Sequence, residues 1–126
     1  MPHRTFGPGP HTLLCDGRAV AQVEVAETSA ARARGLLGTD AIVGALWITR
    51  CPSVHMMGMR YPIDVAVVDA GGTVLRIRTL HPWTGGTWFI RGASATVEAP
   101  EGAMRDWGVG VGSRLSVERP GRARTA

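Results

Sequence analysis

The stretch IDVAVVDAGGTVLRIRTL, residues 63–80, contains the clearest structural signal in this sequence. Two runs rich in β-branched residues flank the tetrapeptide DAGG, a composition typical of two strands joined by a tight turn. Gly71 and Gly72 can adopt the positive φ angles that the favoured hairpin turns require. The stretch therefore predicts a β-hairpin. Pro62 precedes it and lacks a backbone N–H, so we expect the ladder to end there or to place Pro62 at an edge.

Upstream of the hairpin, the sequence predicts a strand followed by a short helix. Apolar and polar residues alternate over residues 20–25, which is the periodicity of a strand. Thr28 is a suitable N-cap, and the helix formers after it end at a glycine, so we expect a helix over residues 29–37. The expected inner face of this helix carries Ala30, Ala33 and Leu37.

Short segments of strand composition recur along the rest of the chain. They are GALWIT (residues 44–49), ATVEAP (95–100) and SRLSVE (113–118). EGAMRDWGVG, residues 101–110, predicts one or two helical turns ending at glycine. With about six or seven short strands and two short helices, we expect a β-rich α+β domain built on a small, barrel-like curled sheet.

The length of 126 residues fits one domain with one hydrophobic core. Residues 1–11 contain three prolines and two glycines and are expected to form a flexible N-terminal arm. Residues 119–126 are expected to form a similar tail. The single domain would therefore span residues 12–118.

The composition argues against several classes of protein. The chain has a formal net charge of +4 from fourteen arginines, with no lysine, and ten acidic residues. Four of the arginines lie in the expected flexible ends, so the domain lacks the clustered basic charge of a nucleic-acid-binding surface. No window approaches the ~18 consecutive apolar residues of a membrane span. The first residues do not resemble a secretory signal, so we expect a cytoplasmic protein with Cys15 and Cys51 reduced.

Metal binding is the first functional hypothesis for the segment SVHMMGMRYPIDV, residues 53–65. In an extended segment His55, Met57 and Met59 would share one face, and an imidazole with two thioethers suits Cu(I). Methionine at alternate strand positions is more often core filling. Cys51 and His55 form a C-x3-H pair, but no second pair repeats the spacing that a zinc site requires. We therefore expect no metal and no cofactor.

Nucleophilic catalysis is a second hypothesis for the same segment. Cys51 would be the nucleophile, His55 its general base, and Asp64 the residue that orients the imidazole. The alternative is that Cys51 is a small buried hydrophobe. Spacing along the sequence does not show whether the three side chains converge.

A binding cleft for a small polar ligand or saccharide is the hypothesis we favour. Asp64 would accept hydrogen bonds from the ligand, Arg60 would pair with an anionic or polar group, and Trp83 would stack. The alternatives are that the tryptophans close the core and that Arg60 and Asp64 form an internal ion pair. The full predicted set is His55, Arg60, Tyr61, Asp64, Trp83 and Trp88.

The order of the segments resembles the DUF192 family, also called UPF0127. The matching pieces are VAETSAARARGLLG (residues 25–38), GALWITRCPSVHMMGMRYPIDVAVVDAGGTVLRI (44–77) and ATVEAPEGAMRDWGVGVGSRLSV (95–117). The central piece is similar to the family branch that reads C-x-x-V-H-x-x-x-M-R-x-P-I-D-V. It is matched by Cys51, Val54, His55, Met59, Arg60, Pro62, Ile63, Asp64 and Val65.

The resemblance implies a small β-rich, barrel-like fold and carries no established activity, substrate or cofactor. Other family members have tryptophan where this chain has His55, which argues against a metal ligand or general base at that position. Asp64 matches both versions, so the resemblance marks it as best suited to a shared role. Many family members carry export signals, from which this chain departs.

The function expected from the sequence is thus a non-enzymatic binding or accessory domain, with a small polar ligand or a protein as partner. An enzyme based on Cys51, His55 and Asp64, or a purely structural or protein-interaction module, is the alternative. A structural module would expose an apolar patch or a free strand edge in place of a cleft.

Overall fold

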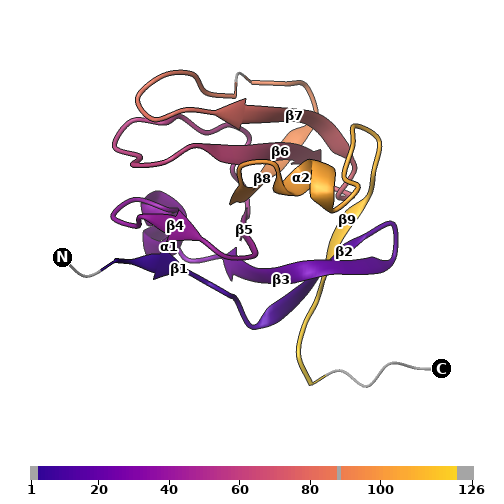
Figure 1. The fold of residues 1–126 in the computed structure, drawn as a ribbon. Coiled ribbons are helices and arrows are strands. Elements are labelled where there is room, and N and C mark those ends of the chain that lie inside the picture. The colour runs from indigo at the N-terminus through magenta and orange to yellow at the C-terminus, as the bar shows by residue number, and fades with distance from the viewer. Residues whose placement is uncertain (1–2, 88, 122–126) are drawn as a thin grey trace.

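The computed structural model describes residues 3–87 and 89–121, and Figure 1 shows its architecture. This part of the chain contains nine strands and two short helices. In chain order they are β1 (Thr5–Phe6), β2 (His11–Cys15), β3 (Arg18–Ala26), α1 (Ser29–Arg34), β4 (Ala41–Ile42), β5 (Ala45–Ile48), β6 (Ile63–Asp69), β7 (Val74–Leu80), β8 (Ala93–Pro100), α2 (Ala103–Asp106) and β9 (Leu115–Glu118). The β-rich class and the two short helices are as predicted.

Seven strands form one sheet in the order β7-β6-β8-β5-β3-β2-β9, while β1 and β4 form a separate parallel pair. Neighbours in the large sheet are antiparallel except for β3 and β5. Figure 1 shows the sheet curling from β7 through β5 to β3 and β9. The loop that joins β3 to β5 contains α1 and β4.

The sheet is curled, as the barrel-like sheet expected from the sequence would be, but it does not close into a barrel. Its edge strands β7 and β9 approach at one corner, where Thr73 bridges Arg114 and Leu115 N–H donates to the Gly72 carbonyl at 2.8 Å. Elsewhere in the described residues no ladder joins these two strands.

The predicted hairpin is confirmed as β6 and β7, with β6 beginning directly after Pro62. The Asp69 carboxylate accepts hydrogen bonds from the N–H groups of Gly71 and Thr73. Of the two turn glycines, Gly72 has a positive φ of 88°. A side chain there would also overlap the carbonyl oxygen of Leu115, so glycine is required by both conformation and space.

The predicted helix forms, but it is shorter than predicted and does not bury the predicted face. Thr28 accepts a hydrogen bond from Ala31 N–H at 3.1 Å, which confirms it as the N-cap. The helix ends at Arg34 because Gly35 has a positive φ of 50°. Leu36 is buried whereas Leu37 is 41% exposed, so the predicted inner face of Ala30, Ala33 and Leu37 is wrong.

Part of the predicted N-terminal arm is ordered structure. β1 pairs with β4, and β2 already begins at His11. Gly9 is buried so closely against β3 that a side chain would overlap the backbone of Val23 and Glu24. Gly9 thus allows the predicted arm to pack closely against β3. Residues 122–126 of the predicted tail lie outside the described residues.

Both faces of the large sheet are covered. One apolar cluster includes Ala66, Val97 and Met104, and α2 packs across β6 and β8 on this face. A second cluster, with Ile48 and Val65, lies on the opposite face together with the chain around α1. Strand alternation therefore decides which of the two cores each side chain enters.

Candidate functional site

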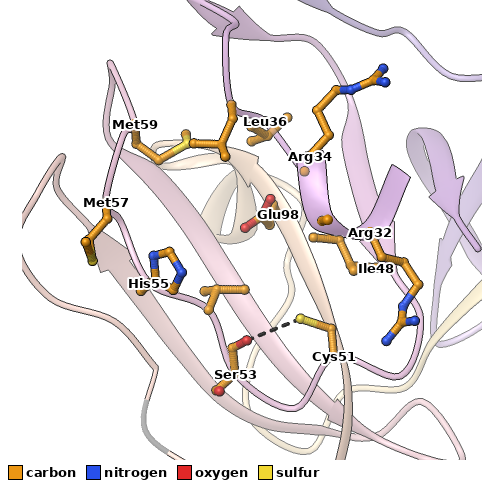
Figure 2. Close-up of a pocket in the computed structure, with 14 residues that line it drawn as sticks. Arg32, Arg34, Leu36, Ile48, Cys51, Ser53, His55, Met57, Met59 and Glu98 are labelled. Atoms are coloured by element: carbon orange, nitrogen blue, oxygen red, sulfur yellow. Dashed lines mark hydrogen bonds between the residues drawn. The ribbon is translucent and has the colours of Figure 1, made fainter. Parts of the chain in front are cut away.

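A cavity opens between the end of α1, the sheet and the segment that follows β5, as Figure 2 shows. Its volume is about 140 Å³. The sheet contributes Ile48 from β5 and Glu98 from β8, and residues 32–37 with parts of residues 51–59 complete the walls. The cavity thus lies on the face of the second apolar cluster.

Glu98 is the central polar group of this cavity. It lies on β8, between Leu46 of β5 and Val65 of β6, and is only 6% exposed. No residue of the described chain donates a hydrogen bond to its carboxyl group. Burial disfavours the charged form and raises the pKa of Glu98 from 4.5 to about 7. The group is therefore a buried, unpartnered carboxyl that changes charge near neutral pH.

Two arginines line the cavity without pairing with this carboxyl group. Arg32 donates from Nε to the Thr49 carbonyl and from Nη2 to the Arg50 carbonyl, both at 2.7 Å. Figure 2 shows the guanidinium groups of Arg32 and Arg34 directed away from Glu98. The carboxyl group is therefore left without a counter-charge.

Cys51, Ser53 and His55 provide the other polar groups of the cavity wall. The half-buried Cys51 thiol donates to the carbonyl of Ser53 at 3.2 Å. His55 is exposed, and its backbone bridges Gly86. Two residues of the predicted catalytic set, Cys51 and His55, thus reach the same cavity.

The third member of that set, Asp64, lies on the opposite face of the sheet. Asp64 pairs with Ala99 and Val65 pairs with Glu98, so alternation directs Asp64 and Glu98 to different sides. Asp64 is 4% exposed and accepts hydrogen bonds from Thr79 Oγ1 at 2.8 Å and from Met104 N–H at 3.1 Å. Its carboxylate ties α2 to β6 and β7 and does not line the cavity.

Arg60 and Tyr61, both predicted to bind ligand, are occupied by partners outside the cavity. The exposed Arg60 forms an ion pair with Asp40 at 3.1 Å. The Tyr61 hydroxyl shares a hydrogen bond of 2.7 Å with Thr39. Burial raises the pKa of the Tyr61 phenol. The hydrogen bond with Thr39 lowers this pKa, and the charge of nearby Glu98 raises it.

The predicted tryptophan loop is tied to the same segment through its backbone. Thr87 N–H donates to the Val54 carbonyl at 2.9 Å, and Val54 N–H donates to Thr87 Oγ1 at 2.8 Å. Trp83 N–H donates to the Met56 carbonyl at 2.9 Å, but its side chain is 68% exposed and does not line the cavity. Trp88 lies outside the described residues.

The predicted soft metal set is divided between core and surface. Met59 is 6% exposed and belongs to the second apolar cluster, whereas Met57 is 61% exposed. Within residues 3–87 and 89–121, no three His, Cys, Asp or Glu side chains are grouped to hold a metal ion.

Sequence reasoning missed Glu98, although one signal was present. Glu98 is the only charged residue in the strand segment ASATVEAP, residues 93–100. Alternation alone would place it on a solvated face, because nothing local shows that residues 32–37 and 51–59 cover that face.

Fold and cavity together define a small β-rich domain with an open, curled sheet and one buried carboxyl in a largely apolar cavity. The chain belongs to the DUF192 family, described as "Uncharacterized ACR, COG1430", whose model matches residues 12–117. This membership confirms the family resemblance found in the sequence. A search of curated proteins gave no match.

Two solved structures are similar to this chain. One is described as a putative transcription regulator from Sinorhizobium meliloti 1021, with a TM-score of 0.68, 21% identity, and coverage of 85% of this chain and 92% of that chain. The other is a protein of unknown function from Novosphingobium aromaticivorans DSM 12444, with a TM-score of 0.67, 21% identity, and coverage of 85% and 83%. At this identity, the similarity concerns the fold. No helix of the described residues is long and apolar enough to cross a membrane.

Proposed function

We propose that this domain binds a small molecule in the cavity around Glu98. The ligand is largely apolar and carries one group that forms a hydrogen bond with the carboxyl group. The observation that supports this proposal is the carboxyl itself, which is buried and lacks any hydrogen-bond donor in the described chain. Such a group costs folding free energy, and native proteins retain few of them. Buried polar groups without hydrogen-bond partners, which break the usual rule of native proteins, concentrate at functional sites.

The chemistry of the cavity wall narrows the class of ligand. Leu36, Ile48, Val54 and Met59 give it a mainly apolar surface. A saccharide would leave several hydroxyl groups without partners there, which is costly. A small amphiphilic molecule therefore fits better than the saccharide expected from the sequence. Of the predicted cleft residues that the structure describes, His55 is the one that lines this cavity.

The test is a thermal-shift screen of small fragments against the wild type, Glu98→Gln and Glu101→Gln. Glu101 is exposed and does not line the cavity, so its variant is the matched control. A fragment at ~100 times its dissociation constant stabilises the folded state by about 2.7 kcal/mol, which raises Tm by several degrees. We expect hits shared by the wild type and Glu101→Gln that are lost in Glu98→Gln. A screen without hits, or with hits indifferent to Glu98, would contradict the proposal.

An enzyme is the second candidate, because Cys51, His55 and Glu98 line one cavity. A carboxyl with a pKa of about 7 is suited to proton transfer at neutral pH. A thiol activated by His55 would be alkylated by iodoacetamide at pH 6 much faster than in His55→Gln. Equal rates in the two proteins would remove this candidate.

A further inference from the structure

We infer that the group held by Glu98 is a primary ammonium on a short apolar stem, so the ligand class is an alkylamine. This inference rests on the proposed function and specifies its ligand. It follows from three properties of the cavity: an uncompensated carboxylate, space beside that carboxylate where a glycine leaves no side chain, and apolar side chains along the walls.

The first property is the balance of charge around Glu98. Among the residues that the structure describes, it is the only acidic side chain that lines the cavity. Arg32 is committed to two backbone carbonyls, and the exposed Arg34 points away from Glu98 (Figure 2). An ionised Glu98 is therefore a buried negative charge without a partner. A cation both neutralises that charge and donates hydrogen bonds to it, whereas a neutral donor supplies a hydrogen bond and leaves the charge uncompensated.

The second property is that Glu98 and the residues at the end of α1 line the same cavity, so the cavity extends to the carboxylate beside α1. Gly35 lies at this point, and the position of a Cβ on it is 3.9 Å from Glu98 Oε1. Because glycine has no side chain, no Cβ of this residue occupies the space beside the carboxylate. An ammonium is compact and has three donors, so it suits this space better than a planar guanidinium.

The third property is the wall between the mouth and Glu98. Leu37 and Met57 are 41% and 61% exposed and line the same cavity as the buried Leu36 and Met59. An alkyl stem would remove these side chains from water, at about 25 cal/mol per Å² of apolar surface. The preference for an apolar stem with a charged tip follows from this arrangement.

The binding of an alkylammonium must be coupled to the ionisation of Glu98. The charged and titratable groups around the carboxyl are Arg32 and Arg34 on α1, and Cys51, His55 and Tyr61 on the segment after β5. At pH 6 a carboxyl with a pKa of about 7 is mostly protonated, and the ammonium must first displace that proton. Apparent affinity is then about tenfold weaker at pH 6 than at pH 8.

The experiment is calorimetric titration of the full chain with n-butylamine, n-butanol and butyrate at pH 6 and pH 8. These probes share the stem and differ in the charge of the tip. We expect butylamine to bind best, about tenfold tighter at pH 8 than at pH 6. The same pH ratio is expected in Glu101→Gln, which excludes a contribution from an exposed carboxylate. Glu98→Gln should lose at least about tenfold in affinity for butylamine and all dependence on pH.

The outcomes separate this inference from the proposed function. If n-butanol or butyrate binds as well as butylamine, and binding still depends on Glu98, the inference of an ammonium ligand is wrong. The proposed binding site around Glu98 is then still supported. If none of the three probes binds, the alkylamine inference fails, and the fragment screen decides whether the cavity binds another small molecule. A lysine side chain presents the same group as butylamine, so Nα-acetyl-lysine methylamide is a further arm. Its binding extends the class to lysine in a protein partner, and its failure restricts the class to free amines.

Discussion

Replacement of Glu98 by glutamine should stabilise the domain at pH 8 and have much less effect at pH 5. Glutamine keeps the size and a polar tip but is never charged. In the wild type, Glu98 has a pKa of about 7 in the folded state, against 4.5 as its ordinary value. The difference of about 2.5 pH units corresponds to about 3 kcal/mol, at 1.36 kcal/mol per unit.

The sign follows from which state holds the proton. Below pH 4.5 the carboxyl is protonated in both states, so its raised pKa costs nothing. Between pH 4.5 and pH 7 the folded state keeps the proton and the unfolded state has lost it, so stability falls as pH rises. Above pH 7 both states are ionised and the loss is complete. The advantage of Glu98→Gln therefore grows from less than about 1 kcal/mol at pH 5 to about 3 kcal/mol at pH 8.

The assay is urea unfolding of the wild type, Glu98→Gln and Glu101→Gln at pH 5, 6, 7 and 8. Any cost of burying the glutamine amide is the same at every pH and cancels when the profiles are compared. Glu101→Gln should follow the wild type, because Glu101 is exposed. A difference between Glu98→Gln and the wild type that stays constant across this range would refute the reasoning, since Glu98 would then ionise as it does in water.

Asp64→Ala should destabilise the domain by about 2–4 kcal/mol in denaturant unfolding, because it removes two hydrogen bonds and leaves a buried N–H unpaired. Fragment binding should be unchanged in that variant. A loss of fragment binding would instead indicate that Asp64 contributes to the binding site. Gly72→Ala should cost at least about 3 kcal/mol through its positive φ and its overlap with the neighbouring strand. Gly71→Ala, where only the Asp69 side chain is near, should cost less than about 1 kcal/mol, and equal costs would contradict the turn geometry. In the native protein, iodoacetamide should label the half-buried Cys51 and spare the fully buried Cys15, and a bound fragment should slow the labelling of Cys51. Mass spectrometry of peptides measures the labelling of each cysteine. If a bound fragment does not change the labelling rate of Cys51, the fragment binds outside this cavity.

Local features of the fold could be predicted from the sequence because a few adjacent residues determine them. The DAGG turn and the Thr28 cap depend on hydrogen bonds within four residues of the chain. The parallel pairing of β3 with β5 depends on segments about twenty residues apart, and strand composition does not specify a partner. The expected barrel failed for the same reason, since the approach of β7 to β9 is a property of the whole sheet.

The candidate site was harder to predict than the fold. His55, Arg60 and Asp64 are close in sequence, and proximity suggested a shared cleft. Alternation along β6 instead directs Asp64 into the core beneath α2. Glu98 was missed because the chain that covers it comes from residues 32–37 and 51–59, far away in sequence. Burial of a charge is a tertiary property, and no local pattern reports it.

The pairing of β2 with β9 has a consequence for how the protein acquires its structure. These strands lie about a hundred residues apart in the chain, and Leu115 of β9 pairs with Cys15 of β2 and is buried in the first apolar cluster. During synthesis from the N-terminus, one edge of β2 therefore stays unpaired until almost the whole chain has emerged. Distant pairings of this kind make folding slow, and an open strand edge is a template for aggregation in the meantime. A nascent chain halted before residue 115 should thus be recognised by chaperones, and release of the last strand should end that recognition.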